Sequence, residues 1–217
     1  MLGATGFSNM RRIQESLRSK PPAVIGGRKV VATDDRWLET GPLGKIVSET
    51  DRMSRDLLTF RLEGDARIIL RPSGTESKNK IYVEVSGKPL GKSASAEVLR
   101  AEKQKIDDAA RGLGRAFTLE MLSRIGVSLP DYALEISDLV ALENKLDFAE
   151  KLLPELVCRL GRGERGAELE AWLDARLKPY GADARLLVEP AVHAYLKEAR
   201  LPEEITRWFR AAFSRKS

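Results

Sequence analysis

The sequence has little cysteine and little histidine. Of its 217 residues, one is cysteine, Cys158, and one is histidine, His193. A single cysteine excludes an internal disulfide framework and a zinc site built from clustered cysteines, and it is typical of a chain from a reducing cytoplasm. With one histidine, we do not expect a catalytic triad or a metal site built from histidines. We expect both residues to serve packing, because each lies in an apolar helical pattern.

Aromatic residues and long apolar runs are also scarce. Aromatic side chains make up 6% of the chain, and no stretch approaches 18 uninterrupted apolar residues, so we expect no transmembrane helix and no membrane partner. With 42% hydrophobic and 32% charged residues, the chain still has the material for globular cores. Its length suits one large or two small domains. We therefore expect a soluble, cytoplasmic protein.

The positive charge is concentrated in the first part of the chain. Residues 1–127 contain 23 Lys and Arg against 16 Asp and Glu, a balance of +7, whereas residues 128–217 contain 14 against 16, a balance of −2. A basic segment is typical of proteins that bind phosphate-bearing small molecules or nucleic acid. An ordinary solvated surface explains the same charge equally well.

The first part mixes helical and strand patterns. Apolar residues from Phe7 to Leu17 recur at helical spacing, and Pro21-Pro22 stops that helix. Because the strand patterns cluster between two helices, we predict an α+β fold with a small antiparallel sheet. The expected later elements are strands near 24–31, 57–62, 67–70 and 81–85, a long loop over 33–55 with a turn at Asp34-Asp35, and a helix through Ile106 and Met121 closed by Gly126.

From about residue 128 the pattern is helical throughout. Apolar residues from Leu139 to Leu160 alternate steps of three and four, and Pro154 interrupts them. With the apolar stripes that follow, this predicts an all-α bundle of four or five short helices, with Trp172 and Trp208 in its core. The predicted domains are therefore 1–127 and 128–217.

One segment, residues 71–80, carries a chemical signature. It reads Arg-Pro-Ser-Gly-Thr-Glu-Ser-Lys-Asn-Lys and lies between two predicted strands. Arg71 can bind a phosphate with its planar fork, Ser73 and Thr75 offer hydroxyl donors, and Gly74 lets backbone N–H groups approach an anion. Physical chemistry alone leaves a plain turn with basic flanks as the alternative.

This string resembles the phosphate-binding loop of the C-terminal domain of the α-D-phosphohexomutases, the phosphoglucomutase/phosphomannomutase family. The family loop usually reads Arg-Pro-Ser-Gly-Thr-Glu-Pro-Lys, so Ser77 replaces a proline, and Asn79 is also unusual. The resemblance covers roughly residues 8–125. It implies the fourth domain of such an enzyme, a sheet with helices packed on one face, similar to the TATA-binding-protein fold.

The resemblance also implies a role for this loop. In the family, a phosphoserine in the first domain exchanges its phosphoryl group with a sugar phosphate through a bisphosphorylated sugar, and the second domain binds Mg²⁺. The fourth domain grips the non-reacting phosphate and closes the cleft. Carried over by position, the substrate phosphate ligands are Arg71, Ser73, Gly74 and Thr75, with Lys78 and Lys80 in support.

Three other motifs of the family are missing from this sequence. We find no Thr-Ala-Ser-His-Asn-Pro segment, no Asp-Gly-Asp-x-Asp-Arg metal loop and no Gly-Glu-x-Ser-Gly-His sugar-reading loop. The chain is therefore expected to be a C-terminal fragment that is inactive by itself, holds no Mg²⁺ ligand and works with the missing N-terminal mutase domains. The choice between glucose and mannose phosphates stays open.

Two further points stay open at this stage. The alternative function is a free-standing, non-catalytic phosphate- or nucleic-acid-binding regulatory module; nucleic acid is disfavoured because the strands lack interleaved aromatic residues. The helical extension 128–217 could mediate oligomerisation, dock on the missing domains or simply lengthen the chain.

Overall fold

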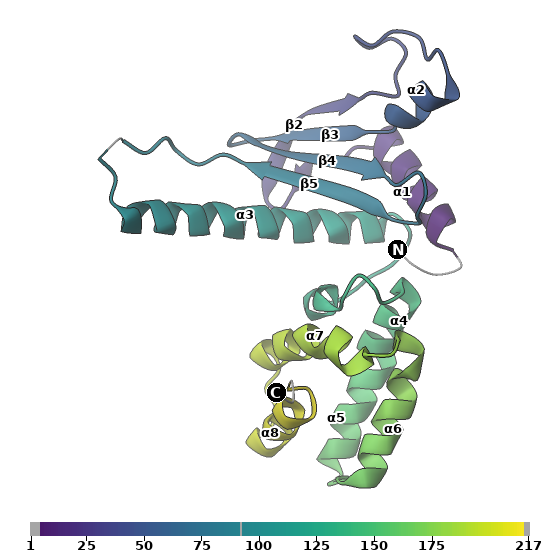
Figure 1. The fold of residues 1–217 in the computed structure, drawn as a ribbon, viewed down its shortest axis with the longest axis vertical. Helices are drawn as coiled ribbons and strands as arrows, with labels where there is room; N and C mark the ends of the chain where they lie inside the picture. Colours follow the sequence, from purple (N-terminus) through teal and green to yellow (C-terminus); the bar gives the residue numbers. More distant parts are fainter. Residues whose placement is uncertain (1–4, 92, 215–217) are drawn as a thin grey trace. The chain divides into compact units, whose positions relative to one another are not determined.

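A computed structural model describes residues 5–91 and 93–214 (Figure 1). Residues 1–4 and 92, from the predicted first domain, and 215–217, from the second, lie outside the described residues. Internal contacts divide the chain into two compact units, one of which is Thr5–Ser128 while the other holds Leu129–Ser217. Each unit is described by itself.

The first unit is built on an antiparallel sheet in which every strand pairs with its neighbour in sequence, in the order β1-β2-β3-β4-β5. This confirms the predicted α+β class. The two-residue turn Gly26-Gly27 joins β1 to β2 with both φ angles positive, 55° and 77°, as a mirror-image hairpin turn requires. The elements of the first unit are α1 (Gly6–Ser19), β1 (Val24–Ile25), β2 (Arg28–Asp35), α2 (Glu49–Ser54), β3 (Leu58–Leu62), β4 (Ala66–Pro72), β5 (Asn79–Val85) and α3 (Ala96–Ser123).

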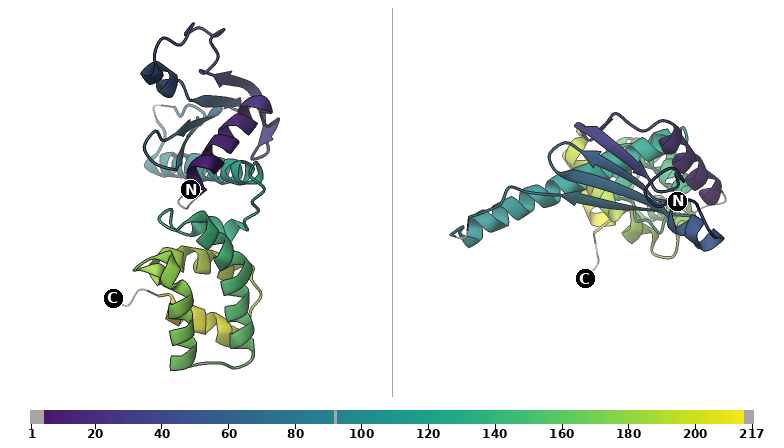
Figure 2. Two further views of the ribbon diagram at one scale, coloured as in Figure 1. Left: turned by 90° about the vertical axis from the view of Figure 1, so that its right-hand side faces the viewer. Right: turned by 90° about the horizontal axis from the view of Figure 1, so that it is seen from above.

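Helices α1 and α3 cover one face of this sheet (Figures 1 and 2). The rings of Phe60 in β3 and Phe117 in α3 lie 5.3 Å apart between centroids. Arg124, which follows α3, donates to the backbone oxygen of Lys20 at 2.8 Å and so caps the end of α1. The inward side chains of β3 and β4 and of the two helices form the core, namely Leu58, Phe60, Leu62, Ile68, Leu70, Met10, Ile13, Leu17, Leu113 and Phe117.

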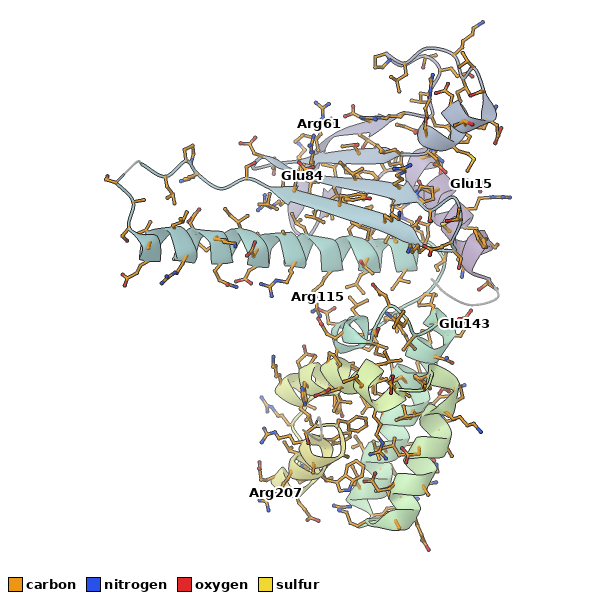
Figure 3. All side chains as sticks on the ribbon, in the orientation of Figure 1. Glu15, Arg61, Glu84, Arg115, Glu143 and Arg207 are labelled. Carbon is orange, nitrogen blue, oxygen red and sulfur yellow. The ribbon has the colours of Figure 1, made fainter. Side chains whose placement is uncertain are left out.

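The opposite face of the sheet is open and carries charged side chains in pairs. Arg61 binds Asp34 at 2.8 Å, and Arg67 binds Glu84 at 2.7 Å; Figure 3 labels Arg61 and Glu84 on this sheet. Side chains alternate between the two faces of a strand. The strand pattern therefore separates an apolar, helix-covered face from a charged face.

The predicted loop over 33–55 is wrong at both ends. Asp34 and Asp35 lie in strand β2 rather than in a turn, because each finds a cation there: Arg61 for the first and Arg18 of α1, at 3.1 Å, for the second. At the other end, Ser48 caps the short helix α2 by accepting from the Asp51 N–H at 3.1 Å.

The second unit is helical, as predicted. Pro154 is the second residue of α5 and follows a π-helical turn, so the expected interruption is present. No helix among residues 5–91 and 93–214 combines the length and the apolar character that crossing a bilayer demands.

The elements of the second unit are the 3-10 turn Asp131–Glu135, α4 (Leu142–Asp147), the π turn Phe148–Leu152, α5 (Leu153–Gly161), α6 (Ala167–Leu177), the 3-10 turn Lys178–Tyr180, α7 (Ala184–Glu198) and α8 (Glu203–Ala212).

Several predicted core positions of this unit are wrong. Leu139 precedes α4 and is 73% exposed, while its neighbour Val140 is buried. Trp172 and Trp208 are only half-buried.

His193 and Cys158 are both exposed, so neither is a packing residue. In α7 the buried positions are Val188, Ala191 and Val192. A helical residue turns about 100° from its predecessor, and this carries the imidazole out of the apolar stripe.

Candidate phosphate-binding site

The segment singled out in the sequence is the connection between β4 and β5. The two strands pair up to their ends, where Pro72 lies opposite Asn79 and Arg71 lies opposite Lys80. The connection itself is therefore residues 73–78, held on a two-stranded stem. Such a stem places a loop on a rigid support, which is what a binding site needs.

Arg71 and Lys80 are exposed on the open face of the sheet. Directly opposite residues of antiparallel strands point to the same side with Cβ atoms about 5 Å apart. The two cationic side chains therefore leave the sheet next to each other at the base of the loop. Like charges in this position repel, and an anion between them would relieve the repulsion.

Two backbone hydrogen bonds close the loop. The Ser73 N–H donates to the Lys78 carbonyl at 2.9 Å, and the Lys78 N–H donates to the Glu76 carbonyl at 2.8 Å. Ser73 is buried, whereas Gly74 and Thr75 are exposed at the tip. The structure thus brings all six predicted ligands into one loop and its stem.

Helix α2 lies against this loop. A Cβ built on Gly74 would come within 3.0 Å of the Met53 Cε, a closer approach than side chains normally tolerate. Sequence reasoning missed this contact because it assigned the whole region to a loop. The signal was available: Ser48 followed three residues later by Asp51 is a helix N-cap pattern.

Arg55 fixes the segment that carries α2. The residue is 7% exposed. Its guanidinium donates to the carbonyls of Leu43, Gly44 and Lys45 at 3.2, 2.7 and 3.2 Å, and to the Asp51 carboxylate at 2.7 Å. That hydrogen bond from Arg55 lowers the pKa of Asp51 below its usual value. One arginine thus holds the loop before α2 against the helix that contacts Gly74.

Glu76 adds an acidic group inside the loop. Its carboxylate forms an ion pair with the Lys78 ammonium, and this contact lowers the pKa of Glu76. Sequence reasoning counted Lys78 as a ligand and did not consider Glu76 as its partner. Glu76 and Lys78 are two residues apart in a tight turn, so their side chains can meet. This spacing is the sequence signal that was overlooked.

Part of the chain is similar to known proteins. The model of the phosphoglucomutase/phosphomannomutase C-terminal domain matches residues 10–101. Those residues are thus similar to a domain of the phosphohexomutase family. A probable phosphomannomutase of Haemophilus influenzae is 41% identical over 82 residues, which cover 38% of this chain and 14% of that protein. No solved structure matches the chain.

The loop departs from the usual string of the phosphohexomutase family at two positions. Ser77 stands where the family has proline. Asn79 begins β5, and both polar atoms of its amide are buried without a hydrogen-bond partner in the described part of the chain. Buried polar groups normally have a hydrogen-bond partner, so the Asn79 amide at the stem of the loop is an exception.

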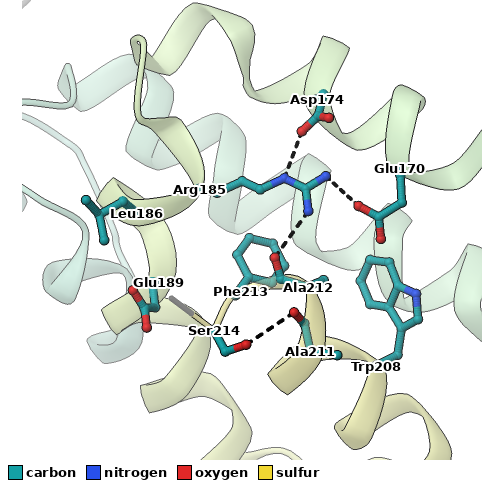
Figure 4. A pocket seen from close by; sticks show the side chains of 10 residues that line it. All are labelled: Glu170, Asp174, Arg185, Leu186, Glu189, Trp208, Ala211, Ala212, Phe213 and Ser214. Carbon is teal, nitrogen blue, oxygen red and sulfur yellow. Dashed lines mark hydrogen bonds and ion pairs between the residues drawn. The ribbon is translucent and has the colours of Figure 1, made fainter. Parts of the chain in front are cut away.

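The helical unit lies outside the residues that match the phosphohexomutase domain, and it contains a surface hollow of about 660 Å³ between α6, α7 and α8 (Figure 4). Arg185 crosses it and binds Glu170 at 2.5 Å, Asp174 at 2.7 Å and the carbonyl of Ala212 at 3.1 Å. These contacts engage all three guanidinium nitrogens, so we interpret Arg185 as a residue that holds the three helices together.

Proposed function

We propose that the first unit binds the phosphate group of a hexose phosphate, as the C-terminal domain of a phosphohexomutase. The observation that carries this proposal is the family loop on its stem, with Arg71 and Lys80 side by side at its base. The family match over residues 10–101 supports it.

Each residue of the loop has a role in this proposal. Arg71 binds two phosphate oxygens through its planar fork, which matches the anion better than a point charge does. The exposed backbone at Gly74 and the hydroxyl of Thr75 donate to a third oxygen, and Ser73 shapes the loop from its buried position. Lys78 and Lys80 add charge that draws the anion in.

The parent reaction is proposed to be the interconversion of hexose 1- and 6-phosphates through a phosphoserine and a bisphosphorylated sugar. Here the domain grips the phosphate that does not react and helps close the site. The binding energy of that remote phosphate then helps to orient the sugar so that the other phosphate can react. Because the Haemophilus relative is called a probable phosphomannomutase, a mannose phosphate is our first choice of ligand.

The catalytic groups of this reaction are proposed to lie in other domains, with which this chain would act in the cytoplasm. The described residues contain no group of three or more His, Cys, Asp or Glu arranged to hold a metal ion. These residues do not fit the Mg²⁺ that the family uses, which we propose is held by those other domains. The chain alone is accordingly proposed to lack mutase activity. Oligomerisation through the helical unit stays a prediction.

An NMR titration tests the proposed site. Adding mannose 6-phosphate to the isotope-labelled chain should shift the amide signals of residues 73–76 and leave those of the helical unit in place. Glucose 6-phosphate compares the two hexoses, and mannose without phosphate is the control. If neither hexose phosphate shifts the amide signals of residues 73–76, the proposal is contradicted.

A further inference from the structure

Glu76 lies in the phosphate loop, where a second function can be assigned. We propose that the Glu76 carboxylate sets the anion affinity and charge selectivity of the loop by competing with the ligand for Lys78. This inference rests on the proposed phosphate site and deepens it.

The backbone of the loop brings the two side chains together. The Lys78 N–H donates to the Glu76 carbonyl at 2.8 Å, which makes a tight turn. The two side chains form an ion pair, and each remains about half exposed, at 55% for Glu76 and 49% for Lys78. An exposed pair of this kind contributes little to stability, so the contact can be exchanged for another at small cost.

The charge of the loop also points to competition. Residues 71–80 carry three cations, Arg71, Lys78 and Lys80, and one acid, Glu76. Lys78 and Lys80 both lower the pKa of Glu76, so the carboxylate is ionised at neutral pH. The loop therefore presents a net charge of +2 rather than +3 to an arriving anion.

An anion that reaches Lys78 must displace the Glu76 carboxylate or sit beside it. Repulsion by that carboxylate grows in proportion to the charge of the ligand. On a logarithmic scale, it therefore lowers the affinity for a phosphate monoester dianion about twice as much as the affinity for a sulfate ester monoanion. Glu76 would thus keep the grip on the substrate phosphate reversible, because tighter binding is expressed mainly as slower release.

The alternative is that Glu76 only closes the loop. Replacing Glu76 by glutamine separates the two, since the amide oxygen can still accept from Lys78 while the negative charge is gone. If closure is the whole role, the variant should bind anions no better than the unaltered chain. If competition operates, it should bind them better.

The experiment titrates the full chain and its variants with methyl phosphate and methyl sulfate at low salt, following the amides of residues 73–78. Glu76→Gln should bind methyl phosphate roughly 3–10-fold more tightly, and methyl sulfate about 2–3-fold more tightly, as the charge dependence requires. Glu76→Asp retains the charge and should stay within about twofold of the unaltered chain. Glu84→Gln is the matched control, because it removes a paired acid elsewhere on β5.

The outcomes separate the inference from the function beneath it. If the unaltered chain binds methyl phosphate and Glu76→Gln binds it equally or less tightly, competition is overturned and the phosphate site stands. Equal gains for both ligands would overturn the charge selectivity. An equal gain in Glu84→Gln would overturn the competition for Lys78, because the loss of another paired acid would then have the same effect. If no variant binds either anion, the proposed function fails and this inference with it.

Discussion

Arg71 and Lys80 face each other across β4 and β5 on the open side of the sheet. Four residues earlier, Arg67 lies on the same side of β4 but is bound by Glu84 at 2.7 Å. The two arginines thus differ in what they can offer: Arg67 is neutralised by a carboxylate, and Arg71 lies beside a second cation.

This contrast provides a matched pair of variants. Arg71→Ala should weaken binding of mannose 6-phosphate roughly 10–100-fold, because a hydrogen bond to a charged group is worth about 1.5–3 kcal/mol. Arg67→Ala should leave the affinity within about twofold. Both are measured by the amide titration. Equal effects of the two substitutions would remove Arg71 from the site.

Gly74 tests whether α2 supports the loop. Gly74→Ala places a Cβ about 3.0 Å from the Met53 Cε, so the loop or the methionine must move, and phosphate binding should weaken severalfold. Adding Met53→Ala makes room and should restore most of the affinity, a coupling that a double-mutant cycle measures. Strictly additive effects would show that the contact does not position the loop.

Arg55 tests how the segment before α2 is held. Arg55→Ala removes the donor to three carbonyls and one of the donors to the Asp51 carboxylate, and should lower the free energy of unfolding by about 2–3 kcal/mol. Denaturant unfolding measures the loss. Arg52→Ala, an exposed arginine on the same helix, should cost less than about 1 kcal/mol. A similar cost for both would contradict the central role of Arg55.

The same cluster predicts a response to acid. Arg55, and the Val47 N–H at 3.1 Å, lower the pKa of Asp51. A lowered pKa in the folded chain means that the carboxylate stabilises the cluster fully above its unfolded value of about 4 and loses this effect as the pH falls through the folded value. Hydrogen exchange of the Val47 amide should therefore speed up below about pH 4, relative to Asp51→Asn. Parallel profiles for both proteins would contradict the prediction.

Tyr180 predicts the opposite response in the helical unit. Burial and its hydrogen bond to Asp147, at 2.9 Å, raise the pKa of Tyr180. The neutral phenol therefore stabilises the fold fully below about pH 10, and the effect is lost as the pH rises towards the folded value. Tyr180→Phe should cost about 1 kcal/mol at pH 8 and less at pH 11, by denaturant unfolding. A difference that does not change with pH would refute this.

The regular elements were predictable because local patterns determine them. Alternation from Leu57 to Leu62 and the spacing of Met10, Ile13 and Leu17 each mark a single buried face, and both elements form where expected. The string at 71–80 likewise joins two strands as predicted, although its first two and last two residues belong to β4 and β5. Here the hydrophobic pattern and the fold agree at every level.

Apart from the cap pattern at Ser48 and Asp51, the segment 33–55 could not be predicted in the same way, because its order depends on hydrogen bonds from Arg55 at its end. Helix α2 buries no residue of its own; Arg55 organises the carbonyls ahead of it, and such long-range donors leave no periodic trace in a sequence. The contact of Met53 with Gly74 follows from that arrangement. His193 and Cys158 were misread for another reason: each adjoins an apolar stripe without belonging to it.

The order of the strands has a consequence for how the domain folds. The β1-β2, β3-β4 and β4-β5 hairpins each close a short stretch of chain, whereas β2 and β3 are joined by the longer segment 36–57. The entropy lost in closing a loop grows with its length. By contrast, Arg124 reaches Ser16 and Lys20 from more than 100 positions away. Proteins rich in local contacts fold fastest, so the meander and the loop at its tip should form early. We therefore expect helix α3 to complete the core last, after the turn at residues 73–78 has already formed.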